Sequence, residues 1–187
     1  MTDLLTGLHN RRYLLEAFDK EIRRADRNER PFCVLMIDVD RFKQYNDAYG
    51  HPAGDKVLQG MGKVIPDALR DLDVVARYGG EEFIALLPQC ELPDAVLAAE
   101  RIRKRLAQQT FDGHQITISV GAAEFPMHGD SPAAVIGAAD EALYEAKRLG
   151  RDQVVGAPAK SGAEAAQKAS KRTVAAVKKR GKVTVGS

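Results

Sequence analysis

The sequence predicts an α/β sandwich, in which helices cover a mixed β-sheet, and three observations support this fold class. Residues 32–38 (FCVLMID) form a continuously apolar run, which is typical of a central strand buried on both faces. Residues 73–88 (DVVARYGGEEFIALLP) contain two apolar runs around a Gly-Gly pair, which is the pattern of a β-hairpin. Segments with apolar residues at helical spacing alternate with these strands, which favours helices on a hairpin-based sheet over a doubly wound nucleotide fold.

The remaining elements follow in order along the chain. Helices are expected over residues 11–27, 42–49, 57–69, 94–109 and 132–149. Besides the first strand and the hairpin, strands are expected over residues 115–123 and 153–155. A turn is expected over residues 50–55, between the second and third helices. No internal repeat is visible, so the sequence predicts one domain over residues 1–156, followed by a tail over residues 157–187.

The predicted domain and the tail differ in charge. The tail is rich in Ala, Lys, Gly and Ser and holds eight Lys or Arg residues against Glu164 alone, whereas residues 1–156 hold 20 basic and 25 acidic residues. The tail offers too little apolar surface to offset its ordering entropy, so we expect it to be disordered. A globular nucleic-acid reader usually carries its basic residues on the folded domain, so nucleic-acid binding is not expected. The weaker alternative, in which the tail binds nucleic acid, predicts binding that collapses with added salt.

The sequence shows no signal for export or membrane insertion. No apolar run approaches the roughly 20 residues that a transmembrane helix needs, and the N-terminus lacks the apolar core of a signal peptide. We therefore expect a cytoplasmic location. Cys33 and Cys90 match no metal-binding spacing and are expected to be reduced, buried thiols.

The predicted central strand ends in two carboxylates, Asp38 and Asp40. Side chains two residues apart on a strand share a face, so both can project the same way where the strand ends. An unpaired carboxylate in a core costs several kcal/mol or shifts its pKa. The strand holds no Lys or Arg to pair with Asp38, so either this end opens to water or a cation binds there. A divalent ion such as Mg²⁺ suits oxygen ligands of this kind.

The hairpin carries a second acidic pair, Glu81 and Glu82, directly after Gly79 and Gly80. If the hairpin lies beside the first strand, one of these carboxylates can approach Asp38, and the pair forms a metal site with room for a triphosphate. Because glycine has no Cβ, its backbone can come close to a ligand. The alternative is that the glycines only form the turn and the glutamates are solvated.

Several cations near these segments could neutralise an anionic ligand. Lys43 begins the short helix after Asp38, while Lys147 and Arg151 flank the end of the last long helix. A basic residue at a helix C-terminus is also favourable by itself, so each is weak evidence alone. The chain has no GxxxxGK[ST] phosphate loop, no GxGxxG after a strand and no HExxH motif. A nucleotide would therefore be held by metal, helix N-termini and scattered cations.

These segments resemble the GGDEF family of diguanylate cyclases, in its GGEEF spelling. The resemblance runs in order through five segments: DLLTGLHNRR (3–12), DVDRFKQYNDAYGHPAGD (38–55), RYGGEEF (77–83), SVGAAEFP (119–126) and ADEALYEAKRLGRD (139–152). It covers the chain to about residue 155 and leaves the tail uncovered. The family resemblance implies a five-stranded, mixed and largely antiparallel sheet flanked by helices, similar to nucleotide-cyclase catalytic cores.

The resemblance also implies a role for each matching residue. Two Mg²⁺ ions, with Mn²⁺ as a substitute, would be held by Asp38, Glu81 and the backbone carbonyl of Val39, and Glu82 would help to activate the attacking hydroxyl. The GTP-binding residues implied by the family are Phe42, Lys43, Asn46, Asp55, Gly79, Gly80, Lys147 and Arg151. Among these, Asn46 and Asp55 would bind the guanine edge, and the three cations would neutralise the β- and γ-phosphates. The reaction implied is condensation of two GTP molecules into cyclic di-GMP and two pyrophosphates.

Two further expectations follow from the resemblance. Because one domain is expected to hold one GTP, catalysis would require a homodimer in antiparallel orientation. The RDLD segment places Arg70 and Asp73 where some family members bind cyclic di-GMP as an inhibitor, with Arg101 as a third contact. A surface salt bridge at a helix end, worth less than about 1 kcal/mol, is the alternative for this motif. The alternative for the whole chain is a non-catalytic module that binds GTP or cyclic di-GMP and signals through a partner.

Overall fold

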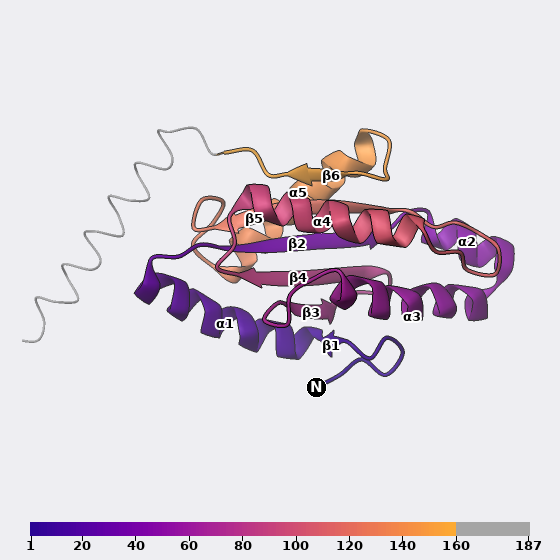
Figure 1. The fold of residues 1–187 in the computed structure, drawn as a ribbon, viewed down its shortest axis with the longest axis horizontal. Helices are drawn as coiled ribbons and strands as arrows, with labels where there is room; N and C mark the ends of the chain where they lie inside the picture. Colours follow the sequence, from indigo (N-terminus) through magenta and orange to yellow (C-terminus); the bar gives the residue numbers. More distant parts are fainter. Residues whose placement is uncertain (160–187) are drawn as a thin grey trace, which may run out of the picture. The chain divides into compact units, whose positions relative to one another are not determined.

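A computed structural model describes residues 1–159, of which residues 1–157 form one compact unit (Figure 1). The disorder expected for the basic tail lies, from residue 160 onward, outside the described residues. The elements of the unit are β1 (His9–Asn10), α1 (Arg11–Asn28), β2 (Phe32–Val39), α2 (Phe42–Tyr49), α3 (His51–Asp67), β3 (Val74–Arg77), β4 (Glu82–Pro88), α4 (Leu92–Ala107), β5 (Ile118–Phe125), α5 (Pro132–Arg148) and β6 (Val154–Gly156).

The described strands form one mixed sheet with β2 near its centre, in the order β1-β3-β4-β2-β5-β6. β2 pairs antiparallel with β4 on one side and with β5 on the other, and β3 pairs antiparallel with β4. The outer pairs β1–β3 and β5–β6 are parallel. The predicted fold class and the largely antiparallel sheet are therefore confirmed. The expected count of five strands is wrong by one, because the two-residue β1 adds a sixth strand that is too short to leave a hydrophobic pattern.

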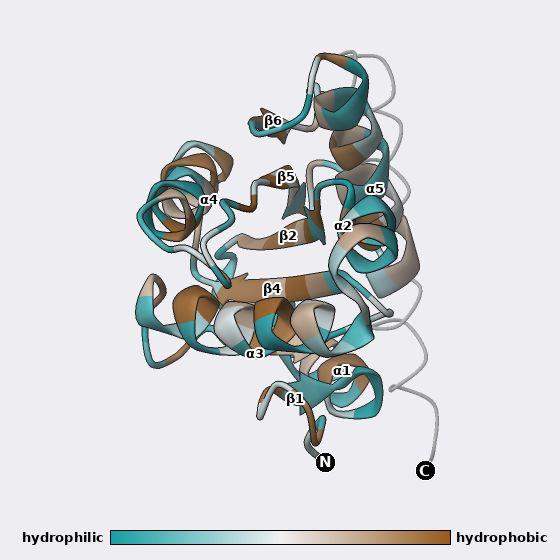
Figure 2. Ribbon diagram, turned by 90° about the vertical axis from the view of Figure 1, so that its right-hand side faces the viewer, coloured by the Kyte–Doolittle hydropathy of each residue, from teal (hydrophilic) through white to brown (hydrophobic). Residues whose placement is uncertain are grey.

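Helices cover both faces of this sheet (Figure 2), which explains why β2 is buried along its whole length. Its odd-numbered residues, such as Leu35 and Ile37, pack in one core cluster with α3 and α4. Its even-numbered residues, such as Val34 and Met36, pack in a second cluster with α1 and α5. Asp38 continues the even-numbered series, so the periodicity of the strand directs its side chain toward the α1 and α5 face.

The turn expected over residues 50–55 is wrong, because the third helix begins at His51. Gly50 alone separates the two helices: it has a left-handed φ of 85°, and its N–H donates to the carbonyl of Asn46 at 2.8 Å. Pro52 lies in the first turn of α3, where the missing N–H of proline has no cost. Asp55 is therefore a helical residue of α3, across the α2–α3 corner from Asn46.

The boundaries around β5 also differ from the expected ones. The strand predicted over residues 115–123 begins only at Ile118. Before it, a bridge between Phe111 and His114 closes a turn around Gly113, which has a φ of 84°. β5 instead runs to Phe125, whose ring stacks on Phe32 of β2 at a centroid distance of 4.7 Å. The observed strand therefore begins and ends later in the sequence than the predicted one.

Two further expectations concern membrane-spanning helices and the state of the two cysteines. None of the helices in residues 1–159 is both long enough and apolar enough to cross a bilayer. Cys33 and Cys90 are free and buried, as expected, and the Cys33 thiol donates to the carbonyl of Cys90 at 3.1 Å.

Candidate active site

Asp38 lies at the end of β2, where it is opposite Glu82 of β4 and Ser119 of β5. Its side chain is only 7% exposed. Lys147, in the last turn of α5, places its Nζ 2.8 Å from Asp38 Oδ1. The cation that the strand itself lacks is therefore supplied by a helix more than a hundred residues further along the chain.

The β3–β4 hairpin lies beside this strand end, as the sequence predicts. The N–H of Val39 donates to the carbonyl of Glu81 at 3.3 Å, which ties the start of β4 to the end of β2. The turn is closed by N–H groups of Tyr78 and Gly79, which both donate to the carbonyl of Glu82. A Cβ on residue 79 would overlap a carboxylate oxygen of Glu82, so any larger residue there would displace the Glu82 side chain. The position of Glu81 thus follows from local backbone bonding.

Arg77 connects the hairpin turn to the N-terminal segment of the chain. The guanidinium of Arg77 donates to the carbonyl of Gly80 at 2.7 Å and forms an ion pair with Asp3 at 3.3 Å. Asp3 also accepts hydrogen bonds from the N–H and hydroxyl of Thr6, so the N-terminal segment is folded against the hairpin. The sequence alone assigns no role to Arg77 or Asp3, because their contact joins residues 74 positions apart.

Burial and nearby negative charges raise the pKa values of Asp38 and Glu81. Burial raises the pKa of Asp38 above its ordinary value, although the charges of Lys147 and Arg151 oppose this change. Burial also raises the pKa of Glu81, and the negative charges of Asp38 and Glu82 raise it further. The repulsion between Asp38 and Glu81 shows that they share one electrostatic environment, in which a bound cation would be favoured.

The donor set fits a hard divalent cation that is completed by its ligand. Within residues 1–159, no group of three or more acidic, His or Cys side chains could hold a metal by itself. Two carboxylates and the adjacent backbone carbonyl of Val39 leave coordination positions open, which is the arrangement that Mg²⁺ adopts with substrate phosphates. The residues at the end of β2 and β4 therefore fit Mg²⁺ together with a phosphorylated ligand.

Asn46 and Asp55 lie on the adjoining helices α2 and α3. The Asn46 Oδ1 atom is buried and has no hydrogen-bond partner among the described residues. It lies against Gly54, where any Cβ would overlap the amide. Buried polar atoms nearly always have a hydrogen-bond partner, so this oxygen is available to accept a hydrogen bond from a ligand or a water molecule. Asp55 is exposed one residue further on.

The other predicted nucleotide-binding residues differ in exposure. Lys43 is exposed in the first turn of α2, and Arg151 is exposed in the loop after α5. The side chain of Phe42 is 7% exposed and belongs to the α3 and α4 core cluster. The prediction that Phe42 binds GTP is therefore limited to its backbone, because its ring is used in packing.

Asp40 has a different role from the one that its position suggests. The sequence predicts only that its side chain can project on the same face as that of Asp38. In the structure it is buried, and its carboxylate accepts three hydrogen bonds, from Ser119, Thr117 and the backbone N–H of Asp152. No signal in the sequence could identify these partners, which come from two other segments.

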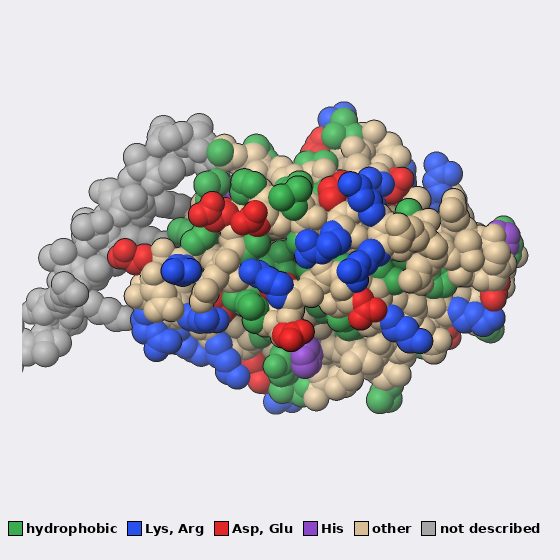
Figure 3. All heavy atoms as spheres, viewed as in Figure 1, with side chains coloured by type: hydrophobic (Ala, Val, Ile, Leu, Met, Phe, Trp, Pro, Cys, Tyr) green, Lys and Arg blue, Asp and Glu red, His purple; other side chains and the backbone are tan. Residues whose placement is uncertain are grey.

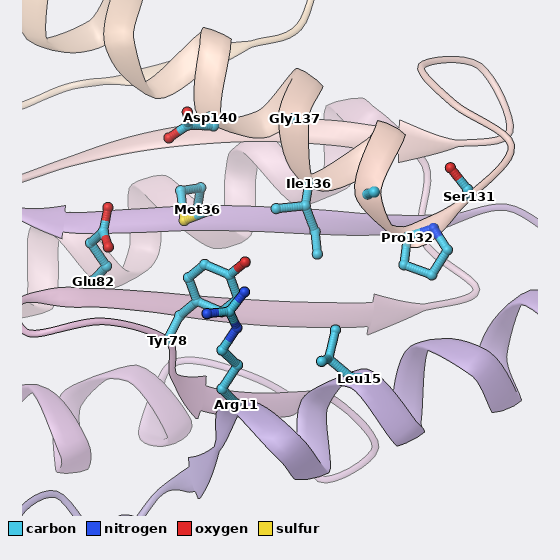
Figure 4. A pocket seen from close by; sticks show the side chains of 11 residues that line it. Arg11, Leu15, Met36, Tyr78, Glu82, Ser131, Pro132, Ile136, Gly137 and Asp140 are labelled. Carbon is cyan, nitrogen blue, oxygen red and sulfur yellow. The ribbon is translucent and has the colours of Figure 1, made fainter.

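Glu82 faces a groove between α1 and α5, with a volume of about 590 Å³ (Figure 4). Met36 of β2 forms its floor, and Asp140 and Ile136 line it from α5. The guanidinium of Arg11 lies 4.6 Å from the centre of the Tyr78 ring at the opposite wall. Glu82 therefore borders open space on the side of the site away from α2 and α3.

A separate charged cluster lies at the C-terminal end of α3. Arg70 and Asp73 form an ion pair at 3.1 Å, and the Arg70 guanidinium also donates to the carbonyl of Pro88 at 3.2 Å. The Asp73 charge raises the pKa of Arg70. Arg101 of α4 donates to the carbonyl of Ala68 at 2.6 Å, so it reaches the same end of α3. The structure thus brings the three predicted inhibitory-site residues to one place, and it contains the ion pair of the alternative interpretation as well.

Basic and acidic side chains are interspersed on the face of the molecule that α3 and α4 cover (Figure 3). A continuous basic surface, which a nucleic-acid interface would need, is not seen on this face.

Taken together, these features define a helix-covered mixed-sheet domain with a carboxylate pair and a lysine at one end of its central strands. Comparison with known proteins assigns the chain within that class: it belongs to the family described as "Diguanylate cyclase, GGDEF domain", which matches residues 1–153. The chain is 42% identical to the response regulator PleD of Caulobacter vibrioides over 162 residues, which are 83% of this chain and 36% of PleD. It is 44% identical to the diguanylate cyclase DosC of Escherichia coli over 157 residues, 81% of this chain and 34% of DosC.

The fold comparison agrees with this assignment. The GGDEF domain of DgcB from Caulobacter crescentus, solved in complex with c-di-GMP, matches with a TM-score of 0.78 and 34% identity, over 83% of this chain and 95% of that one. The chain spans only about a third of the length of the curated relatives PleD and DosC. The family and fold of residues 1–153 are therefore established.

The raised pKa of Glu81 predicts a gain in stability when its charge is removed. A folded-state pKa above the ordinary value of 4.5 means that the ionised side chain costs stability at neutral pH, and that this cost vanishes as the pH falls below 4.5. Glu81→Gln is therefore expected to melt a few degrees higher than the wild type at pH 7, with the difference closing toward about pH 4. Thermal denaturation followed by circular dichroism measures this. Glu29→Gln, at an exposed position, is the matched control, and equal melting temperatures for all three proteins at pH 7 would contradict the prediction.

Proposed function

We propose that this chain is a diguanylate cyclase domain, which condenses two GTP molecules into cyclic di-GMP and two pyrophosphates. The observation that carries the proposal is the meeting of Asp38 and Glu81, two carboxylates of raised pKa, beside Lys147 in a chain of the GGDEF family. Paired carboxylates next to a lysine suit a metal–triphosphate ligand, since the carboxylates can bind the metal ions and the lysine can neutralise the phosphates.

In this proposal, Asp38, Glu81 and the carbonyl of Val39 hold two Mg²⁺ ions, for which Mn²⁺ can substitute. When bound, the ions lower the pKa of the attacking hydroxyl and stabilise the departing oxygen. The 3′-oxygen of one GTP forms a bond to the α-phosphorus of the other, and the bond from that phosphorus to the α–β bridging oxygen breaks to release pyrophosphate. Glu82, which borders the groove beside the site, accepts the hydroxyl proton.

The same proposal assigns the remaining contacts with GTP. The unsatisfied amide of Asn46 and the carboxylate of Asp55 hydrogen-bond the guanine edge. Lys43, Lys147 and Arg151 neutralise the β- and γ-phosphates, which requires Lys147 to exchange part of its contact with Asp38 for the ligand. Gly79 and Gly80 let the hairpin backbone lie close to the nucleotide, and Phe42 contributes its backbone.

Incubation of the protein with GTP and Mg²⁺, followed by chromatography of the products, tests the proposal directly. Cyclic di-GMP and pyrophosphate in a ratio of one to two are expected. Binding of GTP without turnover in concentrated protein would instead identify a non-catalytic binding module. That alternative is less favoured, because Asp38, Glu81 and Glu82 are all present in the arrangement described. A cytoplasmic location, where GTP is available, stays a prediction.

Arg70→Ala is expected to relieve inhibition by the product. We propose that Arg70, Asp73 and Arg101 bind cyclic di-GMP at the end of α3, since two guanidinium groups there can reach the same anionic ligand. Loss of the charge-assisted contacts of one arginine should raise the inhibition constant by at least about tenfold. Initial rates at increasing cyclic di-GMP measure the effect, and the KM for GTP should not change.

The matched control for this prediction is Arg105→Ala, which removes another arginine of α4 that reaches the α3 end through the carbonyl of Asp67. Its inhibition constant should stay close to that of the wild type. Inhibition of Arg70→Ala at wild-type product concentrations would leave the ion pair with a purely structural role.

A further inference from the structure

Asp40 is a buried carboxylate whose hydrogen bonds are all made inside the protein. Its side chain lies at the end of β2, and the residue is 7% exposed. Oδ1 accepts from the Ser119 hydroxyl at 2.7 Å, and Oδ2 accepts from the Thr117 hydroxyl at 2.7 Å and from the backbone N–H of Asp152 at 3.0 Å. With both oxygens engaged by three donors, Asp40 is poorly suited to bind a metal ion, and it joins three separate segments of the chain.

One of these segments is the loop after α5, which has an unfavourable backbone conformation. Arg151 and Asp152 both lie in the left-handed region, with φ values of 67° and 46°. Consecutive non-glycine residues rarely adopt this conformation, and each costs free energy that the surrounding structure must supply. The loop therefore depends on the contacts that hold it in place.

Two contacts tie this loop to the sheet: the N–H of Val120 in β5 donates to the carbonyl of Gln153 at 3.0 Å, and Asp40 holds the residue before Gln153. The Asp152 N–H reaches Asp40, which is 112 positions away in the sequence. The Asp152 carboxylate pairs with Arg103 of α4 at 2.9 Å, and the Arg151 N–H donates to the carbonyl of Ala146 at 3.0 Å. Asp40 and Arg103 thus hold Asp152 by its backbone and by its side chain, whereas the contact with Ala146 connects the loop only to its own helix.

The position of the loop matters because of Arg151. The positive charge of Arg151 already acts on Asp38, whose pKa it lowers against the effect of burial. Asp38 and Asp40 lie two residues apart on the same strand end. The strand that carries the metal-binding carboxylate of the proposed function therefore also carries the anchor for a phosphate-binding cation.

We propose that Asp40 is a positioning residue, which fixes Arg151 relative to Asp38 by holding the backbone N–H of Asp152. The inference rests on the proposed function, because Arg151 acts there on the phosphates of GTP. It separates Asp40 from the catalytic carboxylates, because Asp40 contacts neither nucleotide nor metal. The negative charge of Asp40 also raises the pKa of Asp38, and Asp40→Asn, which removes this charge but keeps hydrogen-bonding groups, separates that effect from the positioning of Arg151.

The test is a double-mutant cycle on nucleotide binding. The dissociation constant of guanosine 5′-(α,β-methylene)triphosphate with Mg²⁺ is measured by calorimetry for Asp40→Ala, Arg151→Ala and the double variant. Arg151→Ala should bind about tenfold more weakly than the wild type, and Asp40→Ala about fivefold more weakly. The double variant should bind as Arg151→Ala does, within about twofold, because residues that act as one unit are not additive.

Two control variants separate positioning from a general loss of structure. Asp40→Asn keeps an oxygen for the Asp152 N–H and an amide that the Ser119 hydroxyl can accept from, so it should bind within about twofold of the wild type. Glu124→Ala removes another buried carboxylate, which accepts from the N–H of Leu92 at 2.7 Å on a different part of the sheet. It should lower thermal stability without a change in nucleotide affinity.

The outcomes are distinguishable. Wild-type affinity in Asp40→Ala, or losses that add in the double variant, would overturn the positioning role. Wild-type affinity in Arg151→Ala would overturn the phosphate role assigned to Arg151 under the proposed function, and this inference with it. If Asp40→Ala does not fold, Thr117→Val replaces it in the cycle, since it removes the donor that shares Oδ2 with the Asp152 N–H. A smaller loss is then expected, which must again be absent in the Arg151→Ala background.

Discussion

Asp38→Asn is expected to lower the rate of cyclic di-GMP formation by about a thousandfold, which corresponds to about 4 kcal/mol of transition-state stabilisation. The substitution keeps the shape of the side chain and removes the charge that Lys147 contacts at 2.8 Å. The neutral amide is a weak ligand for a hard cation, so the metal-dependent part of the proposed reaction is lost. Because burial already opposes the charge of Asp38, the fold itself should tolerate the neutral residue.

The measurement pairs product chromatography with a metal titration. Mn²⁺ binding in the presence of the methylene analogue of GTP should weaken together with the rate, and Glu81→Gln should behave in the same way. The double variant should be little worse than either single variant, since the two carboxylates act on the same ions. Glu29→Gln, an exposed carboxylate at the end of α1, should keep wild-type activity. More than a tenth of the wild-type rate in Asp38→Asn would remove the carboxylate pair from the mechanism.

The elements that the sequence predicts best are those whose pattern depends on local rules. The unbroken apolar run of β2 indicates burial on both faces, and the Gly-Gly pair between two apolar runs indicates the β3–β4 hairpin. The approach of Glu81 to Asp38 follows from these two elements once they are neighbours, because the hairpin then ends beside the strand end. Lys147 is different: its cationic role is implied by the family resemblance, and its contact with Asp38 depends on how α5 packs on the sheet.

The elements that were missed depend on contacts between distant residues. β1 is two residues long and forms a strand only because β3 lies beside it. The helical start of α3 at His51 depends on one left-handed glycine, which can equally belong to a longer turn. Asp40 is an acidic residue two positions after Asp38 in the sequence, and only the tertiary structure shows that its partners come from β5 and from the loop after α5. Hydrogen-bond partners of this kind follow no periodicity, so a single sequence cannot predict them.

The rate per protein molecule is expected to fall about tenfold for each tenfold dilution once the protein is mostly monomeric, because dimer formation is second order. The expected dependence on dimer formation follows from the number of GTP molecules that one domain can hold. Under the proposed function, one domain supplies one metal-binding pair, Asp38 and Glu81, and one guanine-binding pair, Asn46 and Asp55, and would therefore hold one activated GTP. The attacking 3′-hydroxyl must then belong to a GTP held by a second domain, which reaches the side of the site that Glu82 and its groove leave open. Two copies of the chain joined in tandem by a flexible linker are the control, since the linker fixes the local concentration and should make the rate per molecule independent of dilution. A constant rate per molecule for the unlinked chain, from concentrated to highly dilute protein, would mean that one domain completes the reaction without a partner.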